Sequence, residues 1–259
     1  MRNPRKNWLK RLQELEPVSR SARLHDLIYK NIIKEAQDFT PEKVEDYKEN
    51  MQLLGEILLA HQDFQYNPRY GEWDDMFGSY LTETEQLIDR AGQFFTPMNV
   101  VRAMCEMSLG VMTDEEMRDG PPQYINDPAS GCGRFMIGTA EIYAKRVGCL
   151  NFIFVNQDID RRMYIYSTMN AILYGIPSIN IHCDSLTLEY WEGTLVVRPM
   201  GSPTIWKTIS KERLVEIMPK FEAPKKGMEL FVDKVIKERP KPMVIRGISK
   251  PEQRKLFDV

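Results

Sequence analysis

The stretch Asp127-Pro-Ala-Ser-Gly-Cys-Gly-Arg-Phe-Met136 decides the fold, because two glycines stand where an expected strand meets an expected helix. The short β-prone segment 123–126 precedes it, and the run 135–146 that follows has the composition of a helix. Glycine lets the backbone turn sharply and lets a ligand approach without meeting a Cβ atom. The helix start offers free N–H groups to a polar or anionic ligand, although a tight turn without a ligand explains the glycines equally well.

Strands and helices continue to alternate after this turn. The expected strands are 151–155, 178–182 and 194–198, with a helix that ends at Tyr174 between the first two. Such an alternation predicts an α/β fold with a mostly parallel sheet and helices on its faces. In such sheets ligands bind at the carboxyl ends of the strands. The sequence places one carboxylate at each of three strand ends: Asp127, Asp158 and Asp184.

These three carboxylates predict an acid-lined pocket. A single carboxylate after a strand usually caps a helix, but three of them beside a Gly-x-Gly turn favour a ligand site. Asp158 lies 25 residues after Gly133, about the offset at which an acid binds ribose hydroxyls in dinucleotide folds. An acidic pocket suits a ligand that carries cationic groups and no phosphates. A nucleotide-dependent dehydrogenase is the weaker alternative, since Met136 stands where its third glycine belongs.

Four segments, in their order, resemble the motifs of N6-adenine DNA methyltransferases. They are Gly92-Gln-Phe-Phe-Thr-Pro97, 127–135, Gln157-Asp-Ile-Asp160 and Cys183-Asp-Ser-Leu186. The resemblance covers roughly residues 70–200, and the modification subunit of type I restriction–modification systems is the most similar member. It implies a Rossmann-like fold that binds S-adenosylmethionine (SAM), preceded by a helical N-terminal region. It also implies DNA as substrate, with a specificity or other protein subunit as partner.

The resemblance assigns a role to each part of the expected site. Phe95, Thr96 and the turn would hold the methionine part of SAM, Asp158 with Ile159 the ribose, and Asp184 with Ser185 the adenine. The residues of the turn are Asp127, Pro128, Ala129, Ser130, Gly131 and Gly133.

The catalytic tetrapeptide of this family is missing from the sequence. An Asn/Asp-Pro-Pro-aromatic loop is expected after the fourth strand, where its oxygen atoms hold the target amine and its ring stacks on the flipped base. This chain has Arg198, Pro199, Met200 and Gly201 there, and an arginine has no acceptor atom. We therefore expect the isolated chain to methylate DNA poorly or not at all. The alternatives are an enzyme with a degenerate or partner-supplied loop and a DNA- or protein-binding pseudo-enzyme.

The segment before the first motif is expected to be helical. A start at Thr40-Pro41-Glu42 is followed by an apolar stripe of Val44, Tyr47, Met51, Leu54 and Leu58, which predicts a buried face. Another helix is expected over 75–88, and residues 110–122 are expected to form a loop. The whole chain divides into a helical region (1–90), a SAM-binding core (91–206) and a basic tail (207–259).

Composition and charge exclude several classes of protein. Among 259 residues, four scattered cysteines and three histidines predict neither disulfides nor a metal site and favour a reducing cytoplasm. Apolar runs such as Leu150–Val155 are too short to span a membrane. Residues 1–24 have a net charge of +5, residues 207–259 one of +6, and the segment between them one of −13. We expect the basic ends to contact DNA or an acidic partner, although solvated helices explain them as well.

Overall fold

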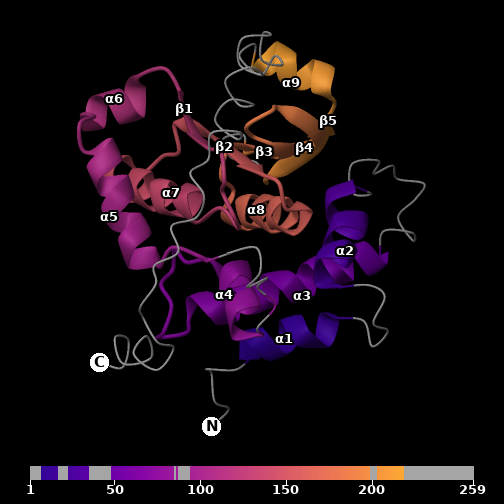
Figure 1. The fold of residues 1–259 in the computed structure, drawn as a ribbon. Coiled ribbons are helices and arrows are strands. Elements are labelled where there is room, and N and C mark those ends of the chain that lie inside the picture. Colours follow the sequence, from indigo (N-terminus) through magenta and orange to yellow (C-terminus); the bar gives the residue numbers. More distant parts are fainter. Residues whose placement is uncertain are drawn as a thin grey trace, which may run out of the picture. The chain divides into compact units, whose positions relative to one another are not determined.

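The computed structural model describes residues 7–16, 23–34, 48–84, 86, 94–198 and 203–218. Its contacts divide the chain into residues 1–222 and 223–259, and all described residues belong to the first part. Within that part a five-stranded sheet is flanked by helices (Figure 1), so the mixed α/β class expected from the sequence is confirmed. The expected boundary between residues 206 and 207 falls inside the last strand.

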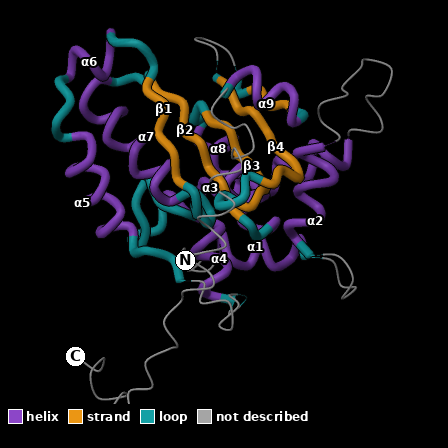
Figure 2. Tube along the Cα trace, turned by 45° about the horizontal axis from the view of Figure 1, so that its top comes forward, coloured by secondary structure: helices purple, strands orange, loops and turns teal. Residues whose placement is uncertain are grey.

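The sheet has the order β1-β2-β3-β4-β5 (Figure 2). Its first three strands are parallel, and β4 and β5 continue it as antiparallel neighbours. The β-branched and aromatic run in β2 and the Ile-rich run in β3 are buried on both faces, as parallel strands usually are. The strands are β1 (Gln123–Asp127), β2 (Phe152–Asp158), β3 (Ser178–Asp184), β4 (Glu189–Val197) and β5 (Ile205–Ile209).

The fourth strand differs from a continued parallel alternation. Without a crossover helix before it, β4 can only fold back on β3, so Glu189 pairs with Asp184 and Val196 with Ser178. The chain after β4 therefore emerges at the amino ends of the parallel strands. The Cδ atom of Arg198 would lie 2.6 Å from a Cβ added at Gly175, the residue that ends the helix before β3.

Helices cover both faces of the sheet. The helices α7 (Arg134–Val147) and α8 (Arg161–Tyr174) pack on the face formed by Phe152 and Phe154, and this side contains the main core. On the other face α9 (Lys211–Ile217) places Leu214 against Val155, Ile179 and Ile181. The expected helices on either side of β2 are confirmed, whereas β5 and α9 were not foreseen.

The N-terminal part of the described chain is helical, as expected. Its longest helix buries Asn50, Ile57, Ala60, His61 and Phe64. The expected buried stripe is wrong, because Met51 and Leu58 are 63% and 47% exposed and the buried face includes two polar residues. The expected helix start at 40–42, with Val44 and Tyr47, lies outside the described residues. The helices are α1 (Asn7–Leu15), α2 (Leu24–Ile28), the π-helix η2 (Tyr29–Lys34), α3 (Lys48–Gln65) and α4 (Met76–Glu83).

Two further helices, α5 and α6, lie between α4 and the first strand. The helix α5 (Met98–Leu109) begins after Pro97, and no side chain caps it. The expected loop 110–122 contains a short helix, α6 (Asp114–Asp119). A capping box causes it, since Thr113 and Glu116 satisfy each other's backbone N–H groups.

Candidate functional site

The turn between β1 and α7 depends on glycine. Gly131 and Gly133 have φ angles of +54° and +83°, a conformation that other residues rarely adopt. A Cβ atom at Gly131 would lie 3.2 Å from the ring of Phe95, and one at Gly133 would lie 3.0 Å from the terminal methyl group of Met136. The backbone N–H of Ser130 donates to the carbonyl of Gln157, which ties the turn to β2.

Asp158 connects the end of β2 to this turn. Its Oδ2 atom accepts a hydrogen bond from the backbone N–H of Gly131 at 2.8 Å, and its Oδ1 atom accepts from Asp160 at 2.8 Å. Both oxygen atoms thus have a structural partner, and each retains acceptor capacity for a second donor. The sequence alone predicted a ligand contact here and missed the structural one.

The other two strand-end carboxylates shape their own loops. Oδ1 of Asp127 accepts from the N–H of Ala129 at 3.1 Å, and Oδ1 of Asp184 accepts from the N–H of Leu186 at 2.9 Å. The parallel register of β1, β2 and β3 brings Asp127, Asp158 and Asp184 to the same edge of the sheet. The structure therefore places all three carboxylates at the same end of the sheet, as the sequence predicted.

The remaining predicted residues of the site differ in exposure. Ile159 is 66% exposed beside Asp158, and Ser185 is half-buried beside Asp184. Pro128 and Ala129 are exposed, whereas Ser130 is buried, and its hydroxyl has no hydrogen-bond partner among the described residues.

Burial makes two of these positions, Asp127 and Asp158, unfavourable for negative charge. It raises the pKa of Asp158, although backbone N–H groups of Asp160 and Gly131 act against the shift and the carboxylate of Asp127 adds to it. Burial likewise raises the pKa of Asp127, against the hydrogen bond from Ala129. A cation bound close to either carboxylate would lower its pKa.

Arg134 holds Phe95 and Thr96 in place, and the sequence did not single out this arginine. Arg134 donates from Nε to Oδ2 of Asp75 at 2.9 Å and from Nη1 to the carbonyl of Thr96 at 2.9 Å. Its guanidinium carbon lies 4.7 Å from the centre of the Phe95 ring, which faces Gly131. Of the two adjacent phenylalanines, Phe94 is 84% exposed, and only Phe95 packs against the core.

The loop after β2 is supported from the next hairpin. Nε2 of His182 lies 3.2 Å from the carbonyl oxygen of Ile159, and its Nδ1 faces Oε1 of Glu192 at 3.3 Å. Although burial opposes ionisation of Glu192, hydrogen bonds from His182, Tyr29 and Arg161 lower its pKa to about 2. This polar cluster holds the main chain of Ile159 in place. No motif in the sequence indicated the cluster.

The segment expected to carry the catalytic loop lies elsewhere. Because β4 is antiparallel, Arg198 is at the amino ends of β2 and β3, opposite the edge that holds Asp158 and Asp184. Arg198 therefore does not lie at the end of the sheet where the catalytic loop was expected. Residues 199–201 lie outside the described part of the chain.

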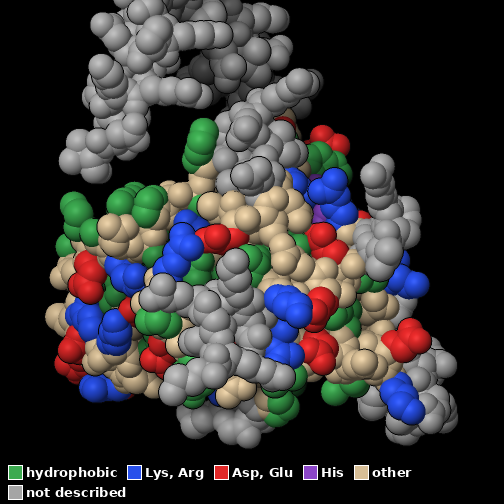
Figure 3. Space-filling model, turned by 90° about the horizontal axis from the view of Figure 1, so that it is seen from below, with side chains coloured by type: hydrophobic (Ala, Val, Ile, Leu, Met, Phe, Trp, Pro, Cys, Tyr) green, Lys and Arg blue, Asp and Glu red, His purple; other side chains and the backbone are tan. Residues whose placement is uncertain are grey.

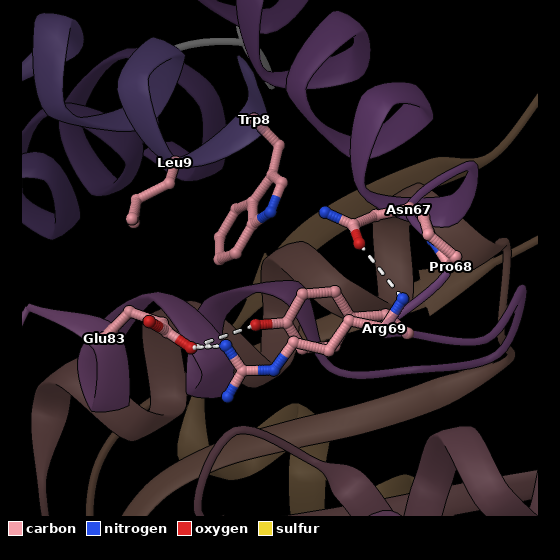
Figure 4. Close-up of a pocket in the computed structure, with 7 residues that line it drawn as sticks. Trp8, Leu9, Asn67, Pro68, Arg69 and Glu83 are labelled. Atoms are coloured by element: carbon pink, nitrogen blue, oxygen red, sulfur yellow. Dashed lines mark hydrogen bonds and ion pairs between the residues drawn. The ribbon is translucent and has the colours of Figure 1, made fainter. Parts of the chain in front are cut away.

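A pocket of about 480 Å³ lies in the helical region and contains none of the predicted site residues (Figure 4). Trp8 and Leu9 of α1 lie on one side of it, and the Asn67-Pro68-Arg69 turn and Glu83 on the other. Arg69 and Glu83 point toward each other and form an ion pair of 2.5 Å. This pocket is thus separate from the edge of the sheet where the carboxylates meet.

The described surface shows no segregation of charge on the face seen in Figure 3. Lys and Arg side chains alternate there with Asp and Glu. The basic ends identified in the sequence fall largely outside the described residues.

In the part of the chain that the structure describes, no cluster of metal-ligating side chains occurs. None of the described helices combines the length and the apolar character needed to cross a membrane.

Together, the fold and the residues described above define an α/β protein with three carboxylates at the carboxyl ends of its parallel strands. Residues 74–200 match the sequence profile of the N-6 DNA methylase family. A type II methyltransferase, M.MamI of Microbacterium ammoniaphilum, is 27% identical over 158 residues, which cover 55% of this chain and 44% of the relative. The segment 74–200 thus belongs to the N6-adenine DNA methyltransferase family, and the chain spans less than half the length of this relative. No solved structure matches the chain.

Proposed function

We propose that this chain binds SAM at the carboxyl ends of β1, β2 and β3 within a Rossmann-like methyltransferase fold. The observation that carries the proposal is the hydrogen bond between Asp158 and Gly131, because it joins two strand-end elements into one polar cradle. Asp158 with Ile159 would hold the ribose, and Asp184 with Ser185 the adenine. Phe95, Thr96 and the turn residues Asp127 to Gly131 and Gly133 would hold the methionine part.

The chemistry of these residues fits SAM. The ligand carries a sulfonium and an amino group, and the half-buried carboxylates of Asp127 and Asp158 favour a nearby cation. A ribose diol donates hydrogen bonds that the remaining lone pairs of Asp158 accept. Glycine at position 131 lets the ring of Phe95 pack against the turn, and the Ser130 hydroxyl, which has no partner among the described residues, offers one further polar contact.

The activity that the family suggests is transfer of the SAM methyl group to N6 of adenine in DNA. We propose that this chain contributes the SAM-binding part, and that the groups which hold the target amine come from another polypeptide. The full sequence contains no Asn-Pro-Pro or Asp-Pro-Pro segment, which supports the proposal that another polypeptide supplies these groups. A pseudo-enzyme that only binds DNA or protein is the second candidate and rests on the same absence.

The direct test is calorimetric titration of the purified chain with SAM, followed by tritium transfer from SAM to unmethylated DNA. SAM binding without transfer is the result expected for the isolated chain. A folded protein that gives no heat at millimolar SAM would exclude the cofactor site.

A second test concerns the basic ends, which we propose to contact the phosphate backbone of DNA. Binding of duplex DNA should then weaken steeply as salt increases, because each phosphate contact releases counterions. DNA binding that is absent at low salt, or that does not respond to salt, would contradict this role.

A further inference from the structure

Within the described part of the chain, no strand pairs with the main-chain groups on the outer edge of β1. The N–H of Phe154 donates to the carbonyl of Pro177, so the main chain of Phe154 faces β3 and that of Val155 faces β1. Since Val155 is paired with Asn126, the N–H and C=O groups of Asn126 and Tyr124 point away from β2. No described strand lies on that side of β1.

The side chains of β1 also lack the cover that its neighbours have. Tyr124 is 54% exposed and alternates with half-buried residues, whereas β2 and β3 are buried along nearly their whole length. The neighbouring α5 exposes Met104 to 47% and Met107 to 80%, and Val111 after it is 85% exposed. An unpaired edge flanked by apolar side chains is a common place for a strand from another chain to bind.

A hollow of about 290 Å³ lies beside this edge, between α5, α7 and the first two strands. Ile125 and Phe154 of the sheet line it together with Leu109 of α5 and Phe135 of α7. The hollow provides room for apolar side chains of a strand that pairs with β1.

The charges around the hollow indicate the charge of the segment that it binds. Three carboxylates belong to the elements around the hollow. Asp127 lines it, and Glu106 follows the lining residue Cys105 in α5. Glu141 lies in α7, two residues after the lining residue Thr139. Glu141 is paired with Arg102, but among the described residues Asp127 and Glu106 have no ion-pair partner. A second copy of this chain would bring the same acids to the edge and be repelled, whereas a segment with lysine or arginine would be attracted.

We propose that the outer edge of β1 and the adjoining hollow bind an extended, lysine- or arginine-flanked segment of a partner protein, which adds a strand to the sheet. Three features carry the proposal: the outward main chain of Tyr124 and Asn126, the apolar hollow, and the uncompensated acids. The bound segment would lie beside Asp127 and Pro128, at the border of the proposed cofactor site. Docking itself does not depend on SAM, so it can be tested separately.

The first experiment uses the full chain and a labelled synthetic peptide of sequence KKTVTITVKK. A second peptide, KKTVPIPVKK, retains the charge but cannot form a regular strand. Fluorescence anisotropy is expected to show binding of the first peptide and at least about tenfold weaker binding of the second. Hydrogen exchange of the Tyr124 and Asn126 amides is expected to slow when the first peptide binds.

A pair of variants tests the strand edge. Asn126→Pro removes an N–H that points away from β2, so it should leave the β1–β2 pairing intact and weaken peptide binding at least about tenfold. The matched Asn126→Ala variant loses the same side chain but keeps this N–H, and should bind within about threefold of wild type. If Asn126→Pro fails to fold, Glu106→Lys on the exposed face of α5 provides an independent test, because it should also weaken the basic peptide.

Three results would overturn the proposal. One is equal affinity for the two peptides, which would show attraction by charge alone. Another is equal binding by the folded Asn126→Pro and Asn126→Ala variants. The third is strong protection of the Tyr124 and Asn126 amides in the free protein, because the edge would then already be occupied.

Discussion

The carboxylate of Asp75 and the guanidinium of Arg134 form an ion pair of 2.9 Å, with Asp75 fully buried and Arg134 13% exposed. Asp75 also caps α4 through the N–H of Gly78 and accepts from the side chain of Asn170 in α8. The pair therefore joins the helical region, the glycine turn and the core helix α8. Through Arg134 it also fixes the Phe95-Thr96 segment of the proposed site.

Replacement of Asp75 by alanine should destabilise the protein strongly. It would leave the charge of Arg134 buried without its partner, a change that typically costs about 3–5 kcal/mol. Glu216→Ala, which breaks the exposed Arg213–Glu216 pair, is the matched control and should cost at most about 1 kcal/mol. Urea unfolding of both variants measures the difference, and similar costs would show that the buried pair has no special role.

Gly131→Ala should weaken SAM binding, whereas Gly148→Ala should not. Both glycines have positive φ, so each substitution strains the backbone by about 1–2 kcal/mol. Only at Gly131 would the new Cβ meet the ring of Phe95, while nothing lies within 4 Å at Gly148. Calorimetry with SAM and thermal unfolding separate the two effects. Equal loss of affinity in both variants would indicate general destabilisation.

Asp158→Ala should reduce the affinity for SAM by about 1.5–3 kcal/mol, because a charged acceptor for the ribose is lost. The substitution also removes the acceptor of the Gly131 N–H, so some loss of stability is expected as well. Asp119→Ala, at an exposed position of α6, serves as the control. Unchanged affinity in a folded Asp158→Ala variant would restrict Asp158 to its structural role.

Acidification should weaken SAM binding. Burial raises the pKa of both Asp127 and Asp158 above 3.8, so these carboxyls begin to take up protons as the pH falls toward that value. A cationic ligand favours the ionised forms, so binding in this range should release protons. Titration in two buffers of different ionisation enthalpy measures the release, and proton uptake would contradict the proposed contact.

Through the same two carboxyls, acidification stabilises the folded protein, although it weakens SAM binding. Their folded-state pKa values lie above the unfolded ones, so their contribution to stability is largest at low pH. It is lost as the pH rises through the raised values. In the absence of SAM, Asp158→Asn should therefore flatten the decrease in the free energy of unfolding between pH 3.8 and neutrality. A steeper decrease in the variant would indicate that another group dominates.

The isolated chain should transfer little or no methyl group to DNA. Methyl transfer to an exocyclic amine requires oxygen acceptors at the reacting nitrogen, and the sequence offers no Asn-Pro-Pro or Asp-Pro-Pro segment to supply them. Tritium transfer from SAM measures the activity, with Asp184→Ala as a control for dependence on the proposed site. Turnover that is typical of DNA methyltransferases and lost in that variant would show that this chain contains a complete catalytic site.

Local patterns made much of the site predictable. The Gly-x-Gly turn, the strands around it and the three strand-end carboxylates follow from short-range signals, because turn residues and runs of β-branched side chains act locally. The Asp75–Arg134 pair was not predictable, since its members are 59 residues apart and each resembles an ordinary surface charge in the sequence. The buried face of α3 was also missed, because it includes Asn50 and His61.

The sequence by itself determined the parallel β1–β2–β3 unit and the family to which it belongs. Only the tertiary structure decided the course of the chain after β3. The antiparallel return of β4 moves Arg198 to the far edge of the sheet and leaves the outer side of β1 without a described strand. Strand direction depends on the connection and on long-range pairing, and neither is encoded in the alternation of apolar residues along a single strand.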